Sequence, residues 1–225
     1  MILKLIDKRK ELKGITTFIF KPDKKIKWIA GQYLIYSLPH ENSDLRGKQR
    51  FFTISSAPHQ NFPSITTRIE KGASSFKNTL DKLKIGGVIY AKGPDGDFVL
   101  EKNSEQNIFI AGGIGITPFI AILRDLSFKK NPYKIKLLYA NKNSSILFKK
   151  ELDQLSFQNK NFEVEYFIGR RKLKKETVRQ FISKKATFFV SGPDPMVADF
   201  EYYLRKNGVV DNRLKLDYFS GYKKI

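Results

Sequence analysis

A glycine-rich segment in the second half of the chain has the composition of an anion-binding turn. Residues 111–118 read Ala-Gly-Gly-Ile-Gly-Ile-Thr-Pro, after a short apolar run and before a helical pattern. Glycines let the backbone approach a ligand, and the first turn of a helix presents free N–H groups and a positive dipole end. We expect Thr117 to cap this helix, with Pro118 at its first position.

This segment predicts a pyrophosphate site in which Gly113, Gly115 and Thr117 take part. It departs from the pattern Gly-x-Gly-x-x-Gly, because Pro118 stands at the third glycine. Gly115 is expected to lie where the backbone approaches the ligand. The alternative is a glycine turn made only for tight packing of a strand against a helix.

A second group of residues lies on a short strand pattern that begins at Arg50. The guanidinium fork of Arg50 suits a phosphate. Side chains two positions apart share a strand face, so Arg50 and Phe52 point one way while Thr53 points the other. Taken alone, this pattern also fits an ordinary strand, which is the simpler interpretation.

Two further junctions join a strand pattern to a helical one, at residues 72–75 and 191–196. The first could hold a second phosphate through its hydroxyl and N–H groups, although a simple helix cap is the favoured interpretation when the segment is taken alone. The second follows an apolar run. In an open parallel sheet, ligands bind outside the carboxyl ends of strands, so segments 111–118 and 191–196 can face one pocket.

Short strand patterns fill the first half of the chain. They lie at residues 3–7, 16–20, 33–37, 51–55, 65–70 and 88–92, with glycines and prolines between them. Regularly spaced short strands are typical of an antiparallel sandwich or barrel. One helix interrupts them, and either Ser74 or Ser75 is expected to cap it.

The second half alternates strand and helix patterns. Apolar runs stand at residues 108–111, 135–140, 162–168, 187–190 and 214–218. Such alternation predicts a parallel sheet of five strands with helices on its faces. A polar stretch at 101–107 separates the two halves, so we expect one domain over residues 1–103 and another over 104–225.

The composition excludes several kinds of site. The chain has no cysteine, which rules out disulfides, cysteine-bound zinc, a thiol nucleophile and an iron–sulfur cluster held by this chain. Its two histidines, His40 and His59, argue against a multi-histidine metal site. No metal is therefore expected.

The net charge of +20 admits two interpretations. One is an anionic partner, such as a nucleic acid, a membrane surface or an acidic protein. The other is compositional bias, because the lysines are spread along the whole chain rather than clustered. The second interpretation is favoured, and no nucleic-acid partner is expected.

Neither a signal peptide nor a membrane span is expected. The first ten residues carry five charged side chains, which interrupt any apolar core of a leader. The uncharged segment 107–123 contains three glycines and a proline. It is slightly short for a span and fits a buried strand, a turn and a helix start better. We therefore expect a cytoplasmic protein.

Six segments resemble motifs of the ferredoxin–NADP reductase superfamily, in particular its stand-alone two-domain bacterial members. Arg-x-Tyr/Phe-Ser/Thr, Gly-x-x-Ser, Gly-Gly-x-Gly-x-Thr-Pro and Gly-Pro-x-x-Met are matched in order at residues 50–53, 72–75, 112–118 and 192–196, and two further landmarks at 31–33 and 93–98. The resemblance spans essentially the whole chain. It implies an N-terminal antiparallel Greek-key β-barrel that binds FAD, followed by a C-terminal α/β domain with a parallel five-stranded sheet that binds NAD(P)H.

The resemblance also implies roles for individual residues. Arg50 would contact the flavin pyrophosphate, Phe52 would lie against the isoalloxazine, and Thr53 would hydrogen-bond near N5, the atom that accepts hydride. Thr53, Phe52 and Ser191 are the implied catalytic residues. The residues implied to bind FAD are Arg50, Phe51, Phe52, Thr53, Ile69, Gly72, Ala73, Ser74 and Ser75, and those implied to bind the dinucleotide are Gly113, Gly115, Thr117, Gly192, Pro193 and Met196.

Four positions leave the details open. The family often has Tyr where Phe52 stands and Cys where Ser191 stands, which leaves the rate and the placement of the nicotinamide unsettled. Arg170 and Arg171 follow the third predicted parallel strand and could reach a 2′-phosphate. A solvated basic loop explains that pair equally, so the choice between NADH and NADPH stays open.

The expected function is that of a flavin-dependent oxidoreductase that transfers hydride between NAD(P)H and FAD N5. Because the chain carries no appended cysteine-rich or haem domain, the electrons are expected to leave to a separate acceptor: ferredoxin, flavodoxin or a small molecule, with an acidic redox protein as one candidate. The first alternative is a reductase subunit of a larger complex with little activity alone. The second is a binding module that keeps the fold and binds no flavin.

Overall fold

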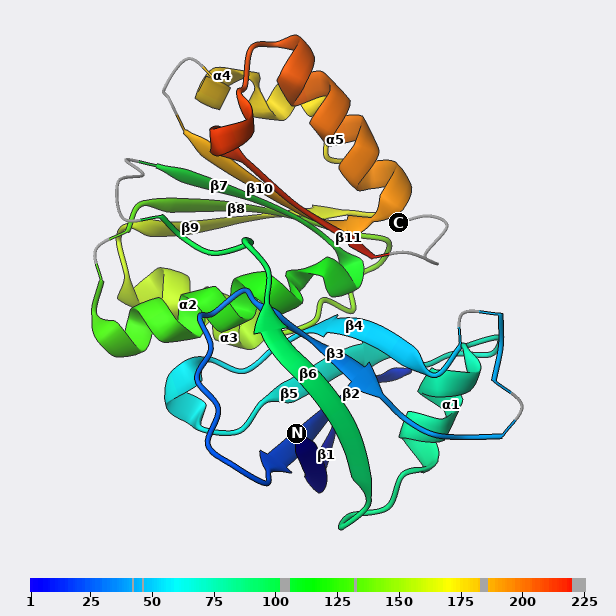
Figure 1. Ribbon diagram of the computed structural model, residues 1–225. Helices are drawn as coiled ribbons and strands as arrows, with labels where there is room; N and C mark the ends of the chain where they lie inside the picture. Colours follow the sequence, from blue (N-terminus) through cyan, green and yellow to red (C-terminus); the bar gives the residue numbers. More distant parts are fainter. Residues whose placement is uncertain (42, 46, 102–105, 132, 183–185, 220–225) are drawn as a thin grey trace. The chain divides into compact units, whose positions relative to one another are not determined.

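The computed structural model describes residues 1–41, 43–45, 47–101, 106–131, 133–182 and 186–219 (Figure 1). The chain divides into two compact units, Met1–Val99 and Leu100–Ile225. Each unit has its own sheet and its own hydrophobic core. The division falls beside the polar stretch where the two strand patterns of the sequence meet.

The N-terminal unit is built on one six-stranded sheet (Figure 1). Its strands are β1 (Ile2–Leu12), β2 (Ile15–Pro22), β3 (Tyr33–Ser37), β4 (Gln49–Thr53), β5 (Ser64–Arg68) and β6 (Val88–Asp95). They lie in the order β4-β3-β6-β1-β2-β5, and all neighbouring pairs are antiparallel. This six-stranded antiparallel half-barrel confirms the antiparallel barrel predicted for this half of the chain.

The first strand is longer than its apolar pattern predicts. β1 continues through the charged residues 7–10, because their backbone pairs with β2, as in Arg9 with Thr17. Gly14 closes the hairpin with φ +72°, a conformation that glycine adopts without steric cost. Backbone pairing, and not side-chain alternation, therefore determines the length of this strand.

Helix α1 (Ser75–Lys82) completes the core of the N-terminal unit. Its Phe76 and Leu80 are fully buried among strand residues such as Phe18 and Leu34. Ser74 is the N-cap, as predicted for one of the two serines, and its Oγ accepts a hydrogen bond from Lys77 N at 3.4 Å.

A chain of buried hydroxyls lies in the same unit. Ser55 Oγ is 2.8 Å from Ser64 Oγ and 2.9 Å from Thr66 Oγ1, and Thr66 Oγ1 is 2.8 Å from Thr17 Oγ1. These bonds join β2, β5 and the segment after β4. The hydroxyl of Ser55 is thus part of the internal structure of the unit.

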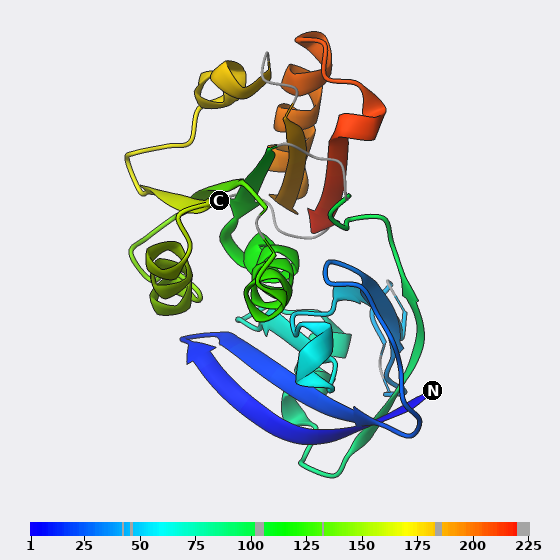
Figure 2. The same cartoon turned by 90° about the vertical axis from the view of Figure 1, so that its left-hand side faces the viewer.

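The C-terminal unit is a parallel sheet with helices on both faces (Figures 1 and 2). Its strands are β7 (Asn107–Gly112), β8 (Ile135–Asn141), β9 (Phe162–Ile168), β10 (Thr187–Pro193) and β11 (Leu214–Phe219), in the order β11-β10-β7-β8-β9. Helices α2 (Thr117–Lys129) and α3 (Lys149–Gln158) cover one face, and α4 (Arg179–Ile182) and α5 (Asp194–Lys206) cover the other. The predicted five-stranded parallel sheet is confirmed.

The central strand β7 is buried on both sides, which explains why its sequence is apolar without alternation. Ile108 and Ile110 pack into the core that contains Phe200 of α5. On the other face, the ring of Phe109 stacks on that of Phe119 of α2 with centroids 4.6 Å apart. The uncharged segment 107–123 is accordingly divided among a strand, a turn and a helix. Among the residues that the structure describes, no helix is long and apolar enough to cross a membrane.

Candidate functional site

The turn after β7 is a short 3₁₀ helix, Gly113–Ile116, that leads directly into α2. Thr117 is the first residue of α2 rather than its cap, and its Oγ1 donates a hydrogen bond to Ile114 O at 3.2 Å. The prediction that Thr117 caps the helix is therefore wrong. The reason is that the turn itself supplies a carbonyl within reach of the hydroxyl.

The two glycines of this turn, Gly113 and Gly115, differ in what lies next to them. A Cβ on Gly115 would lie 2.3 Å from Ser191 O and 2.5 Å from Ser191 C, so the chain itself excludes a side chain there. Gly113 has φ +53°, and nothing lies within 4 Å of the position of a Cβ. Open space for a ligand therefore lies at Gly113, whereas Gly115 is required by the packing of the turn against β10.

The carboxyl end of β10 closes on the same turn. Ser191 pairs with Ala111 in the parallel register, and a Cβ on Gly192 would lie 3.2 Å from Gly112 N and 2.9 Å from Met196 Cε. Pro193 ends the strand, and α5 begins at the next residue. The sheet order reverses between β7 and β10, which is where open α/β sheets bind ligands. The structure thus brings the two predicted segments together.

Two polar side chains at this edge of the sheet were not singled out from the sequence. Asn141 ends β8, and its buried Nδ2 has no hydrogen-bond partner among the described residues. Asp217 of β11 accepts a hydrogen bond from Ser191 Oγ at 3.3 Å. The signal for Asn141 was available, because it is the first polar residue after an apolar strand pattern.

The two arginines after β9 differ in their surroundings. Arg171 forms an ion pair with Glu165, its Nη1 donates to Tyr166 O at 3.3 Å, and its guanidinium lies 5.0 Å from the Phe167 ring centroid. Arg170 is exposed, and its side chain has no partner among the described residues. Of the pair, Arg170 is the one available to an incoming anion.

A hydrogen bond fixes the last strand of the unit beside this edge. Tyr218 of β11, which pairs with Gly192, donates to Glu201 of α5. Desolvation and this hydrogen bond raise the pKa of Tyr218 to about 12. The same bond, aided by Arg205, lowers the pKa of Glu201.

In the N-terminal unit, the aromatic residues of β4 point to opposite faces. Phe52 is buried in the core, with ring centroids 5.9 Å from Tyr36 and 5.8 Å from Phe76. Phe51 is 64% exposed and lies edge-on to Tyr33. Thr53 is buried at the end of the strand. The exposed ring on β4 is therefore that of Phe51, and Phe52 belongs to the core.

The turn before α1 leaves space above its glycine. Gly72 has φ +85°, and nothing lies within 4 Å of the position of a Cβ. Ala73 N donates to Glu70 O at 2.9 Å and so closes the turn, while Ile69 packs against the core. Ser75 begins the helix.

Arg50 lies close to the start of this helix. Its Nη2 donates to Asp44 Oδ1 at 2.8 Å, and Ser75 N donates to Asp44 Oδ2 at 3.0 Å. A guanidinium and a helix N-terminal amide thus converge on one carboxylate, which is the donor set of a phosphate site. The fold thus brings together the donors of Arg50 and Ser75, which are 25 positions apart in the sequence.

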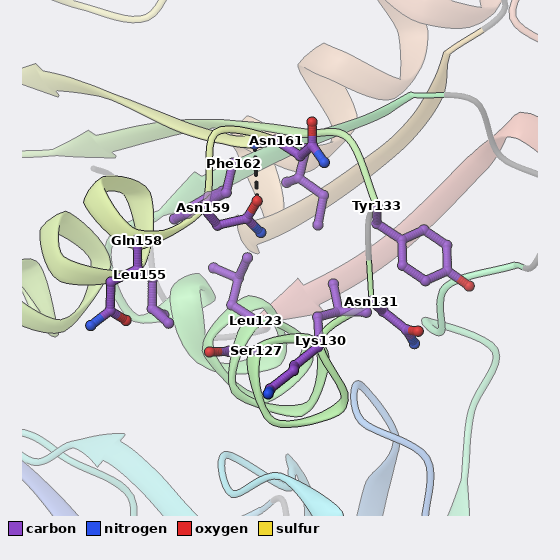
Figure 3. Close-up of a pocket in the computed structure, with 12 residues that line it drawn as sticks. Leu123, Ser127, Lys130, Asn131, Tyr133, Leu155, Gln158, Asn159, Asn161 and Phe162 are labelled. Carbon is purple, nitrogen blue, oxygen red and sulfur yellow. Dashed lines mark hydrogen bonds between the residues drawn. The ribbon is translucent and has the colours of Figure 1, made fainter.

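A hollow of about 340 Å³ in the C-terminal unit lies elsewhere (Figure 3). It lies between α2 and α3, beside the first residues of β8 and β9, Ile135 and Phe162, and so at the amino end of the sheet. Asn159 on its rim accepts a hydrogen bond from Asn161 N at 2.9 Å. None of the predicted site residues lines it.

Comparisons with known proteins agree with this arrangement. Residues 109–201 match the family described as oxidoreductase NAD-binding domain. A flavohemoprotein of Candida albicans is 30% identical over 94% of this chain and 57% of its own length, and one of Bacillus thuringiensis is 27% identical over 96% and 60%. The chain therefore spans about three fifths of the length of these curated relatives.

Solved structures share the fold over nearly the whole chain. A ferredoxin–NADP⁺ reductase from Neisseria gonorrhoeae, with bound FAD and NADP, superposes with a TM-score of 0.77 at 16% identity and covers 97% of this chain and 98% of that one. The flavohem-like FAD/NAD-binding domain of a Vibrio cholerae nitric oxide dioxygenase gives a TM-score of 0.77 at 20% identity, with 97% and 98% covered.

Proposed function

We propose that the chain belongs to the ferredoxin–NADP reductase family of FAD- and NAD(P)-binding oxidoreductases. It would move electrons by hydride transfer between NAD(P)H and N5 of a bound FAD, and from there to an acceptor. The observation that carries the proposal is the turn Gly113–Ile116, packed on the end of β10 at the point where the sheet order reverses. A dinucleotide is the ligand that such a point suits.

The N-terminal unit fits a flavin dinucleotide. The donors of Arg50 and Ser75 already converge on one carboxylate, so their geometry suits an anion. Gly72, three positions before Ser75, has open space in the direction of a side chain. We assign the pyrophosphate to Arg50 and to residues 72–75. Thr53 at the end of β4 is assigned to flavin N5, and the exposed Phe51 ring, rather than the buried Phe52 ring, is assigned to the isoalloxazine.

The C-terminal unit fits the nicotinamide dinucleotide. We assign its pyrophosphate to the amides from Gly113 to Thr117, because Gly113 leaves open space at the start of that turn. Ser191, Gly192, Pro193 and Met196 form the neighbouring wall at the end of β10. Asn141 Nδ2, a buried donor at the same edge, joins this set as a further contact.

The cofactors supply the redox chemistry, since a flavin accepts a hydride from a nicotinamide and passes the electrons on. The residues assigned above would bind the two groups and orient them within their units. No acid–base pair is required for a hydride step. Its two histidines are therefore not needed as catalysts.

The acceptor has two candidate classes. A free-standing reductase would serve ferredoxin, flavodoxin or a small molecule, and the net charge of +20 would favour an acidic redox protein. A reductase component of a larger complex is the second candidate. It is supported by the match to only 57–60% of each of two flavohemoproteins, whose name implies both a flavin and a haem.

Flavin release and reduction test the proposal. Protein that is reconstituted with FAD, desalted and denatured is expected to release about one FAD per chain. Stopped-flow mixing with NADH and with NADPH should then bleach the flavin absorbance, and a small artificial acceptor should restore it. Absence of flavin after reconstitution overturns the proposal. Reduction without turnover on the artificial acceptor selects the reductase component of a larger complex.

A further inference from the structure

One carboxylate, that of Asp44, occupies the donors assigned to the flavin pyrophosphate. Its Oδ1 accepts from Arg50 Nη2 at 2.8 Å, and its Oδ2 accepts from Ser75 N at 3.0 Å. A phosphate group that binds Arg50 Nη2 and Ser75 N would need the same two N–H groups. Asp44 therefore lies where such an anion would bind.

Further hydrogen bonds inside the unit involve Arg50, Ser75 and Asp44. Arg50 Nη1 donates to Gly47 O at 2.9 Å and to Gln49 O at 2.6 Å. Asp44 N donates to Ser75 Oγ at 3.0 Å, and Ser75 Oγ lies 2.9 Å from His40 Nε2. This network holds the carboxylate in place through its backbone as well as its side chain.

Burial makes the contact stronger than an ordinary surface ion pair. The Arg50 side chain is 13% exposed and that of Asp44 30%. The guanidinium also lies 5.7 Å from the centroid of the Phe76 ring, in the core. Screening by water is reduced at such a site, so the attraction between Arg50 and Asp44 is stronger than in bulk water.

We propose that Asp44 is an internal competitor of the flavin pyrophosphate, which must displace its carboxylate to reach Arg50 and Ser75. The inference rests on the proposed function, because it concerns the same flavin site. The ion pair between Arg50 and Asp44 has to break each time FAD binds, and this lowers the net free energy of binding. FAD therefore binds less tightly, and exchanges more readily, than the donor set alone would allow.

If Asp44 instead supported FAD binding, removal of its charge would change the FAD affinity in the opposite direction. If Asp44 only held Arg50 in position for the phosphate, removal of its charge would weaken FAD binding. If Asp44 competes, removal of the charge strengthens FAD binding while the protein without flavin becomes less stable. The pair of measurements separates the two roles.

The test is Asp44→Asn in the full chain. Its single side-chain oxygen can still accept from Ser75 N, and an uncharged NH2 group then faces Arg50 where the second carboxylate oxygen was. Glu41→Gln, an exposed acid in the same loop, is the matched control for the change in charge. Kd for FAD is measured by quenching of flavin fluorescence in protein stripped of flavin, and Tm is measured with and without FAD.

We expect Asp44→Asn to lower Kd by about tenfold, which corresponds to about 1.4 kcal/mol, to slow FAD release, and to lower the Tm of the flavin-free protein. Glu41→Gln should leave Kd within about twofold. If Asp44→Asn fails to fold, Asp44→Ser removes the carboxylate without added bulk and should shift Kd in the same direction.

An unchanged or raised Kd in the folded variant, with FAD bound by the wild type, overturns the inference alone. An equal gain in Glu41→Gln also overturns it, because the effect would then be general electrostatics. If neither wild type nor variant binds FAD, the proposed function itself is overturned, and the inference falls with it.

Discussion

The chain builds two junctions of the same kind, a strand followed by a glycine turn and a helix, and the two use their glycines differently. At the junction before α1, Gly72 has a positive φ and open space in the direction of a side chain. At the junction before α2, Gly115 has the backbone of Ser191 in that direction, at 2.3 Å. Gly72 is required by its positive φ and has open space beside it, whereas Gly115 is required because the backbone of Ser191 lies against it.

The polar groups of the two junctions differ as well. At α1, the amide of Ser75 is held by the carboxylate of Asp44. At α2, the hydroxyl of Thr117 turns back to Ile114 within the turn. Similar motifs therefore lead to different local chemistry, because each turn meets a different neighbour in the folded unit.

The largest effect on stability is expected from a substitution at Gly115, which tests whether the two glycines are required for different reasons. Gly115→Ala should destabilise the protein by about 3 kcal/mol or more, because its Cβ meets a strand backbone that cannot move independently. Gly113→Ala is the control and should cost about 1–2 kcal/mol, from its left-handed backbone alone. Urea unfolding measures both. Equal losses in the two variants would show that contact with Ser191 is not what requires a glycine.

Arg50→Ala tests the other junction. It should weaken FAD binding by about 1.5–3 kcal/mol, the typical loss of charge-assisted hydrogen bonds. Arg9→Ala, which removes an exposed arginine paired with Asp7, is the control for charge. Titration of flavin-free protein with FAD measures the change. An affinity equal to that of the control would remove Arg50 from the flavin site.

The two arginines after β9 allow a sharper comparison within the C-terminal unit. Arg170→Ala should weaken NADPH binding by about 1–3 kcal/mol and leave NADH nearly unchanged, if this side chain contacts the 2′-phosphate. Arg171→Ala should have a smaller effect, since Arg171 is already paired with Glu165. Michaelis constants for NADH and NADPH, measured at two salt concentrations, test whether Arg170 contacts the 2′-phosphate. Equal losses for NADH and NADPH that fade with salt would indicate general steering alone.

Thr53→Val keeps the shape of the side chain and removes its hydroxyl. We expect flavin reduction to slow by about tenfold, equal to about 1.4 kcal/mol in the barrier, with little change in FAD affinity. Stopped-flow reduction under single-turnover conditions measures it. A wild-type rate in the folded variant would place the Thr53 hydroxyl away from N5.

The smallest effect concerns the bond between Tyr218 and Glu201. Its contribution to stability is lost as pH falls through the lowered pKa of Glu201, and again as pH rises from 10 towards the pKa of Tyr218, about 12. The free energy of unfolding of Tyr218→Phe should therefore be lower than that of the wild type between those pH limits. Outside them the two values should be equal. The difference should stay below about 1 kcal/mol, because solvent screens this exposed pair. Denaturation at several pH values tests it, and a difference independent of pH would assign the effect to packing.

Local patterns in the sequence determined much of the architecture. Apolar runs separated by helical patterns predicted five parallel strands, and short alternating segments predicted the antiparallel unit. Ser74 was predicted as one of two caps of α1, and its hydroxyl does accept from the helix. These features depend on residues that are neighbours in the chain, so a sequence contains the information directly.

Contacts between distant residues were decided only by the tertiary structure. The need for glycine at 115 comes from Ser191, and the anion that Arg50 meets comes from Asp44, which also reaches Ser75 from 31 positions away. The burial of Phe52 depends on Tyr36 and on a helix that follows later. Each depends on which segments the folded sheets bring within van der Waals or hydrogen-bond distance, and no local pattern encodes that choice.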